Sequence, residues 1–471
     1  MSLAQATIAA IVGLPPLIPF FGVTGLMFFL FRRDFRERPN VTGALWLPTL
    51  WMFLMASRSP LQWLTLAGLP LSANSWQEGN PLDAIVFLTL TLAGILILCR
   101  RQVSLSEIVS ENAWLGIFVL YCFVAIFWSD FPLVGFKRWI KILGHPVMVL
   151  VVFSEPDPIE GFLRLLKRLA YVVLPVSILW LKYFPDLGRV YDEWGIANNC
   201  GITQGKNALG GVCMVFGLVF FWHLLHVWRR PKSVSRRSEL YLIIGLLLMV
   251  LYLLRKAHSA TSWIALLLSV STMVFLGLRS VNKKMIGAYA VGAVALLIIL
   301  QLTFDIYGKI VDLSGHEETI QGRGHLWEVL LKTDTNPIFG TGFESFWLGD
   351  RLQKIWEEVH WHPGQAHNGY LELYLNLGGV GLLVFLGLII ATFRKIRLDL
   401  LWNFEWGRLE MCLLIAILAH NWTEAAFRGL SLTFFMLFMV AMSYWKLRVA
   451  SEQPSLHGRG LEEETALVYE S

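Results

Sequence analysis

Long apolar runs, separated by short polar segments, recur along the whole chain. A helix needs about 20 predominantly apolar residues to cross the hydrocarbon core of a bilayer. Runs of this kind lie at 8–31, 42–56, 83–99, 113–128, 134–153, 165–184, 207–228, 240–254, 261–278, 285–304, 368–392, 409–422 and 430–445. Several are short, so the pattern predicts 12 or 13 membrane-spanning helices and an all-α, polytopic membrane protein.

Composition agrees with this prediction. Hydrophobic residues make up 56% of the 471 residues and charged residues only 15%, whereas soluble domains carry about 25% charged residues. The net charge of +5 comes from basic residues between the apolar runs, which indicates a lipid bilayer and not a nucleic acid as the partner. The five cysteines form no CxxC motif and are interpreted as apolar core residues.

Basic residues also predict the orientation, because loops on the cytoplasmic side carry an excess of Lys and Arg. With the spans above, all of the basic clusters fall on one side: 32–36, 100–101, 164–168, 229–237, 279–284 and 394–408. The longest loop on the other side, 305–367, carries ten Asp or Glu against five Lys or Arg. We therefore expect it to face the periplasm.

Four parts follow from this division. Residues 1–304 are predicted to form an N-terminal transmembrane bundle, 305–367 the large periplasmic loop, 368–449 the C-terminal transmembrane helices, and 450–471 a disordered cytoplasmic tail. Within the loop, 324–332 places apolar residues at helical spacing, which predicts a short helix lying on the membrane face. The Asn-Pro and the glycines of 336–342 predict a tight turn after it.

The external segments hold the candidate chemical groups. Arg323 offers planar, bidentate donors that suit a diphosphate; its alternative role is an ion pair with a carboxylate of the loop. His367 stands at the external end of a span, where it is either a general base or a hydrogen-bonded structural histidine. Lys206 and Asn207 stand at the mouth of another span, where the lysine either meets a phosphate or reaches toward the interface.

Other interpretations of these polar residues are weaker. Zinc is not predicted, because His360, His362 and His367 lack a helical i, i+4 spacing and a completing Cys or Glu. Glu424 lies four residues before Arg428, a spacing that permits a structural ion pair. The chain has no Walker loop, GxGxxG, GxSxG or HExxH motif, so ATPase, dinucleotide, serine-hydrolase and zinc-protease functions lack support.

Three motifs follow one another along the external loop and into the next span: Arg323-Gly-His-Leu-Trp327, then Asn336-Pro337-Ile-Phe-Gly340-Thr-Gly342, then His367-Asn368 with Gly378 after ten intervening residues. In this order they resemble the signature of the O-antigen ligase and polymerase superfamily. Further segments resemble the exopolysaccharide polymerase branch more than the lipid A-core ligase branch: Ser57–Trp63, Gly205–Gly210, Ser259–Ser262 and Asn421–Glu424.

The resemblance implies an inverting glycosyltransferase of class C fold that needs neither metal nor cofactor and acts at the periplasmic face of the bacterial inner membrane. Its implied partners are a glycan on undecaprenyl diphosphate as donor, an acceptor glycan, and other proteins of polysaccharide export. Arg323 matches the arginine that holds the donor diphosphate, and His367 the histidine that activates the acceptor hydroxyl. The expected substrate-binding residues are Arg189, Lys206, Asn207, Asn368 and Arg255.

Two alternatives to polymerisation remain open. One is ligation, a single transfer of finished glycan to lipid A-core or to another acceptor. The other is transport of lipid-linked sugars, a function for which internal repeats and charged residues at mid-membrane are typical. The distinctive residues lie instead in one asymmetric external loop, which favours an enzyme.

Overall fold

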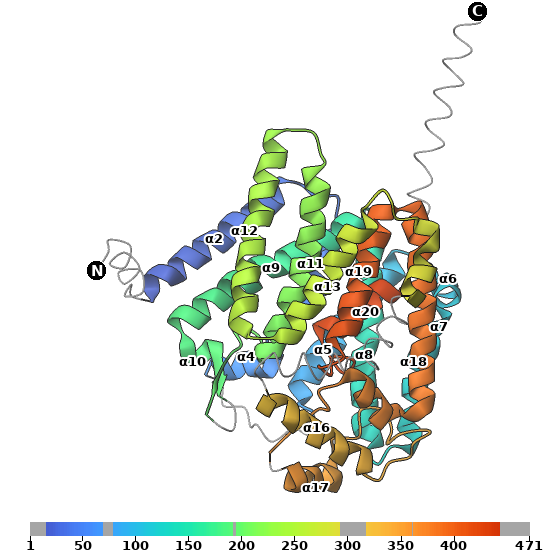
Figure 1. Ribbon diagram of the computed structural model, residues 1–471. Helices are drawn as coiled ribbons and strands as arrows, with labels where there is room; N and C mark the ends of the chain where they lie inside the picture. Colours follow the sequence, from blue (N-terminus) through green and yellow to red (C-terminus); the bar gives the residue numbers. More distant parts are fainter. Residues whose placement is uncertain (1–15, 69–78, 192–194, 293–316, 360, 443–471) are drawn as a thin grey trace, which may run out of the picture.

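The computed structural model describes residues 16–68, 79–191, 195–292, 317–359 and 361–442, and these are almost entirely helical (Figure 1). The elements up to the short ribbon are α2 (Leu17–Arg36), η1 (Gly43–Leu45), α3 (Trp46–Ala56), α4 (Pro60–Leu66), α5 (Pro81–Arg100), α6 (Leu105–Glu111), α7 (Ala113–Val124), η2 (Ala125–Trp128), α8 (Pro132–Phe153), α9 (Pro158–Tyr183), α10 (Pro185–Gly188), β1 (Arg189–Tyr191) and β2 (Ala197–Asn199). Those that follow are α11 (Lys206–Trp228), α12 (Val234–Ala257), α13 (Ala260–Leu276), η3 (Lys283–Met285), α16 (Glu317–Lys332), α17 (Gly349–Val359), α18 (Gly369–Trp402), α19 (Phe404–His420) and α20 (Leu432–Ala441).

The predicted spans match this helix order. In the described part of the chain, α5, α11, α12 and α18 are long and apolar enough to cross a membrane, and shorter apolar helices include α13 and α20. The all-α, polytopic membrane fold is therefore confirmed. Most of the predicted span 285–304, the start of the first span and the tail 450–471 lie outside the described residues. The count of 12 or 13 spans stays a prediction.

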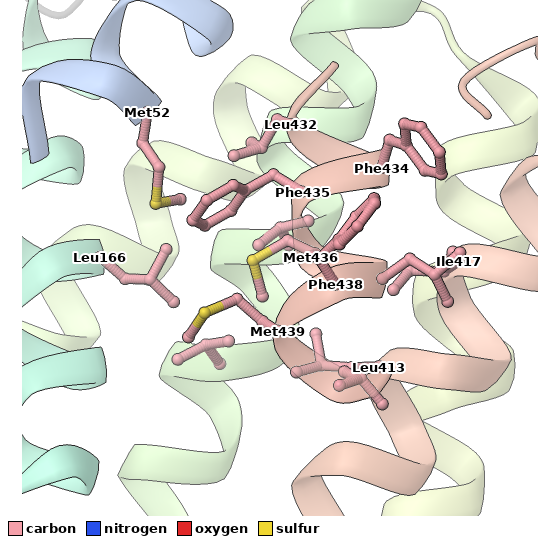
Figure 2. Packing of buried hydrophobic residues seen from close by; sticks show 14 of the residues in the cluster. Met52, Leu166, Leu413, Ile417, Leu432, Phe434, Phe435, Met436, Phe438 and Met439 are labelled. Carbon is pink, nitrogen blue, oxygen red and sulfur yellow. The ribbon is translucent and has the colours of Figure 1, made fainter. Parts of the chain in front are cut away.

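Helix α20 forms the centre of the bundle. Every residue from Leu432 to Ala441 is buried, and Figure 2 shows its phenylalanine and methionine side chains packed against Met52 of α3, Leu166 of α9, and Leu413 and Ile417 of α19. A helix that is apolar on all sides belongs in a core. The N-terminal end of α20 is therefore held firmly where the loop 421–431 enters it.

Helix α18 is broken at Gly378, and the predicted turn 336–342 explains the break. Gly378 has φ +66°, and a Cβ there would lie 2.2 Å from the carbonyl oxygen of Ile338. The carbonyls of Pro337 and Ile338 accept hydrogen bonds from the amides of Gly379 (2.9 Å) and Val380 (3.1 Å). The turn thus satisfies backbone groups that the break leaves without a helical partner. The predicted turn is confirmed.

The loop segment has a small core of its own. Helix α16 includes the predicted segment 324–332 but begins earlier, at Glu317. Leu326, Val329 and Leu330 are buried against side chains of α17 and of the 346–347 segment. A second amphipathic helix, α17, covers this apolar face. The expected helix is therefore present, and its position on the membrane face stays a prediction.

Ion pairs bring several of the basic clusters to the same region. Arg164 of α9 pairs with Asp34 of α2, and Arg33 pairs with Glu239 of α12. In Figure 1 the connection between α11 and α12 lies at one end of the molecule, and α16 and α17 lie at the other. This arrangement agrees with a shared side for these clusters, while the assignment of that side to the cytoplasm stays a prediction.

Candidate active site

Glu424 stands in the loop between α19 and α20, where three of the predicted site residues meet. Its side chain is buried, with a relative exposure of 8%. The Nδ2 atom of Asn207 donates to its Oε1 atom at 2.6 Å, and the Nη2 atom of Arg323 lies 3.4 Å from the same oxygen. The Nδ1 atom of His367 lies 3.9 Å from the other oxygen, Oε2. One carboxylate thus contacts both residues that the sequence predicts to be catalytic.

Arg323 and His367 are also held by groups other than Glu424. The Nη1 atom of Arg323 donates to the carbonyl oxygen of Thr423 at 3.0 Å. The Nδ1 atom of His367 lies 3.3 Å from the amide nitrogen of Gln365, and its ring stacks on Trp361 with centroids 6.1 Å apart. His367 itself has φ +50°, in the left-handed region that non-glycine residues rarely adopt. Such an uncommon backbone conformation is typical of functional sites.

The charge of Glu424 is set by its neighbours. Burial alone would raise the pKa of this carboxyl group, but the interactions with His367 and with the positive charge of Arg323 lower its pKa below the ordinary value. Glu424 is therefore an anion at neutral pH. A buried anion between a guanidinium and an imidazole stabilises positive charge on both.

A second buried carboxylate, Glu372 of α18, positions the chain on the N-terminal side of His367. Its Oε2 atom accepts from the amide of Ala366 at 2.9 Å, and its Oε1 atom accepts from Trp347 Nε1 at 2.8 Å. Arg428 lies 3.6 Å from this Oε1 atom. The ion pair that the spacing permits between Glu424 and Arg428 does not form, because Arg428 pairs with Glu372 instead.

A cavity of about 830 Å³ opens beside these groups. Its lining includes Lys206, Asn207, Gln365 and Glu424. Other lining residues come from several of the predicted membrane helices and from the external loop. Arg323 and His367 are not among the lining residues and contact the cavity through Glu424. The cavity is therefore adjacent to Arg323 and His367, with the carboxylate of Glu424 between them.

The remaining predicted residues lie around this centre. The side-chain oxygen of Asn368 caps α18 by accepting from the amides of Tyr370 and Leu371. Arg189 lies in β1 beside Val190; Val190 lines the cavity and Arg189 does not, as expected from the alternation of side chains along a strand. Arg255 is exposed near the end of α12. In the described part of the chain, neither Arg189 nor Arg255 pairs with Glu424.

Within the described residues, no group of three His, Cys, Asp or Glu side chains is arranged to hold a metal ion. His360 lies outside the described residues. The ring of His362 packs against Trp356, with centroids 4.8 Å apart.

The sequence interpretation underestimated Glu424 and missed Glu372. Both are carboxylates next to helix ends, a position that by itself does not separate a site residue from a solvated one. The available signal was the order Asn421-Trp-Thr-Glu424 directly after an apolar span, where an unpaired carboxylate would be costly.

Comparisons with known proteins agree with the motifs. Residues 244–386 match a family model described as O-antigen ligase, a range that includes Arg323 and His367. A protein of Rickettsia typhi that is provisionally named a polysaccharide ligase is 24% identical over 303 residues, which cover 59% of this chain and 67% of the relative. A protein of Rickettsia felis with the same provisional name is 22% identical over 320 residues, covering 65% and 73%.

Proposed function

We infer, from the match of residues 244–386 to the O-antigen ligase family model and from the geometry around Glu424, that this chain is a membrane glycosyltransferase. We propose that its donor is a glycan on undecaprenyl diphosphate and that it polymerises the repeat units of a surface polysaccharide. We propose that the reaction takes place at the periplasmic face of the inner membrane. The proposed site residues meet between α16, the start of α18 and the loop that precedes α20.

One observation carries this proposal: Arg323 and His367 contact opposite oxygens of the same buried carboxylate. Arg323 belongs to α16 and His367 immediately precedes α18, so two separate elements bring a diphosphate-binding group and a proton acceptor together. An enzyme that transfers a sugar from a lipid diphosphate needs both groups within one substrate's reach. This arrangement supports catalysis over transport.

The proposed step is a direct displacement. The acceptor hydroxyl oxygen attacks the anomeric carbon, the bond from that carbon to the diphosphate oxygen breaks, and the electron pair leaves with the diphosphate. His367 takes the hydroxyl proton, and Arg323 stabilises the negative charge that grows on the leaving group. The lipid diphosphate is already a good leaving group, so the step requires no nucleotide.

Glu424 acts as a positioning residue in this proposal. As an anion it orients the His367 ring through Nδ1, so that Nε2 faces the acceptor, and it stabilises the imidazolium that forms when the proton is taken. Asn207 fixes the carboxylate from the opposite side. Lys206 lines the cavity and is proposed to neutralise a phosphate within it. Arg189 and Arg255 are proposed to contact the substrate farther from the reacting atoms.

Ligation is the second candidate, and the names of the two Rickettsia relatives favour it. Purified protein would be incubated with undecaprenyl-diphosphate oligosaccharide, without nucleotide or metal, and the products sized by mass spectrometry. A ladder of repeat units would support polymerisation. A single transfer to an added acceptor would support ligation. Unchanged donor under all acceptor conditions would contradict glycosyl transfer.

A further inference from the structure

His420 is the last residue of α19, four positions before Glu424, and it lines the cavity. Its side chain is buried, with a relative exposure of only 3%. Neither Nδ1 nor Nε2 has a hydrogen-bond partner among the described residues. An imidazole in this situation is unusual, because buried polar atoms in native proteins nearly always have partners and an unpaired one destabilises the fold.

The other buried histidines in the described bundle differ in this respect. His145 accepts a hydrogen bond from Trp51 and contacts the carbonyl of Gly429 through its second nitrogen. His223 bonds Glu239 through Nε2, and only its Nδ1 atom has no partner among the described residues. These rings are connected to protein groups, whereas the polar atoms of His420 are left for a group that enters the cavity.

Residues of two other helices line the cavity near His420. A Cβ at Gly211 of α11 would lie 3.4 Å from both Cε1 and Nε2 of the ring, which places the ring next to this helix. Gly211 and Thr433 of α20 also line the cavity. The imidazole of α19 therefore lies in the cavity wall among residues of α11 and α20.

The rest of the lining indicates the chemistry of the ligand. Trp347 and Trp356 contribute aromatic surface, and Glu344 and Arg428 contribute an anion and a cation. Aromatic faces together with both donors and acceptors fit a sugar, which has apolar C–H faces and a rim of hydroxyl groups. A neutral imidazole has one donor and one acceptor nitrogen, the pair that a hydroxyl group can satisfy.

We propose that the cavity holds a sugar of the substrate and that His420 binds one of its hydroxyl groups. This inference rests on the proposed glycosyl transfer and adds a specificity-determining residue to it. The hydroxyl belongs either to the donor sugar or to the acceptor sugar, which share this chemistry. Kinetics that vary the two substrates separately distinguish them.

The experiment compares His420→Leu and His420→Gln with the wild type in the oligosaccharide transfer assay. His226→Gln serves as the matched control, because His226 is a half-buried histidine near the other end of α11, stacked on Trp222. We expect the KM for one substrate, donor or acceptor, to rise by about 2- to 10-fold in the leucine variant, the range for one hydrogen bond. The control should keep both KM values.

Thermal unfolding separates this role from a structural one. Because His420 makes no internal hydrogen bond in the described structure, His420→Leu should leave the melting temperature of the substrate-free protein unchanged or raise it. Unchanged KM values for both substrates in His420→Leu would overturn the inference. So would a fall in melting temperature with no change in KM.

The test also works if the proposed transfer itself fails. If the wild type transfers sugar and His367→Ala does not, the proposed function is supported independently of His420. If the wild type transfers nothing, calorimetric binding of the free oligosaccharide still tests the cavity. Weaker binding to His420→Leu than to the wild type would support the inference, and equal binding or no binding would contradict it.

Discussion

Two buried carboxylates gather cations in different parts of the bundle, and their surroundings differ. Asp34 of α2 accepts from Arg164 at 2.9 Å and from Arg168 at 2.8 Å, and its side chain is fully buried. Glu424 contacts Arg323 and His367 at 3.4 and 3.9 Å. Glu424 lines a large cavity, whereas Asp34 does not. The same chemical group is therefore sealed in one region and accessible in the other.

This contrast teaches that paired charge alone does not identify a site. The contacts of Asp34 are short, and they join α2 to α9 inside the protein, as expected for a structural ion cluster. Glu424 accepts a short hydrogen bond from Asn207 at 2.6 Å, but its contacts with Arg323 and His367 are longer than those of Asp34. These longer contacts with two titratable or cationic groups, beside a cavity, leave capacity for a substrate. Substitutions at His367, Asp34 and Glu424 test this comparison, two of them with a control variant.

The largest expected effect is the loss of catalysis when His367, a partner of Glu424, is replaced. His367→Ala removes the proposed proton acceptor, so the turnover rate should fall by about 10²- to 10⁴-fold. The melting temperature should stay close to that of the wild type, because the ring is partly exposed and its polar contacts are long, 3.3 Å to Gln365 and 3.9 Å to Glu424. Initial rates in the oligosaccharide assay and thermal unfolding measure the two quantities. Normal product formation by this variant would remove His367 from the mechanism.

Asp34→Asn tests the sealed cluster and should act on stability. Removing the anion leaves Arg168 without its carboxylate partner, while Arg164 keeps Glu160 and Glu37. Breaking a buried pair from one side costs about 3–5 kcal/mol. We expect poor accumulation in membranes and a lower unfolding midpoint, with a normal turnover rate per folded molecule.

Asp130→Asn is the matched control for this prediction. Asp130 pairs with Arg351 at 2.8 Å, but its side chain is 58% exposed, so the loss should be below about 1 kcal/mol. Equal destabilisation by the two substitutions would show that the cluster around Asp34 is not a sealed structural unit.

Hydrophobic periodicity predicted much of the fold, since spans such as 83–99 and 207–228 coincide with α5 and α11. The order of motifs predicted Arg323 and His367, whose convergence the structure then displays. The break in α18 could not be predicted from the sequence, because the helical pattern continues through Gly378. The reason for the break is the contact of this part of α18 with the distant turn 336–342.

Glu424 shows why the centre of the site escaped sequence reasoning. It is 101 positions from Arg323 and 217 from Asn207, so no local spacing connects them. Its nearest cation along the chain, Arg428, suggested a helical pair, but the segment after α19 is a loop, and the tertiary structure turns the two side chains to different partners. Only packing of α11, α16 and α18 around the loop defines the site.

Glu424→Gln is the smallest and most specific change. It keeps the shape and the acceptor oxygen for Asn207 but removes the negative charge between Arg323 and His367. Hydrogen bonds to charged groups contribute about 1.5–3 kcal/mol, so a loss of this size from the transition state should lower kcat by roughly 10- to 100-fold. Glu424→Asp keeps the charge and should recover part of the rate.

The pH dependence of stability completes this test. The pKa of Glu424 is lowered in the folded protein, so its ionisation stabilises the fold above the ordinary pKa of a glutamate, and this contribution is lost as the pH falls through the lowered pKa. The wild type should therefore be more stable than Glu424→Gln at neutral pH, and the two should converge in acid. A difference in unfolding free energy that stays constant with pH would mean that Glu424 acts through its shape and not its charge. The comparison with Asp34 would then lose its electrostatic basis.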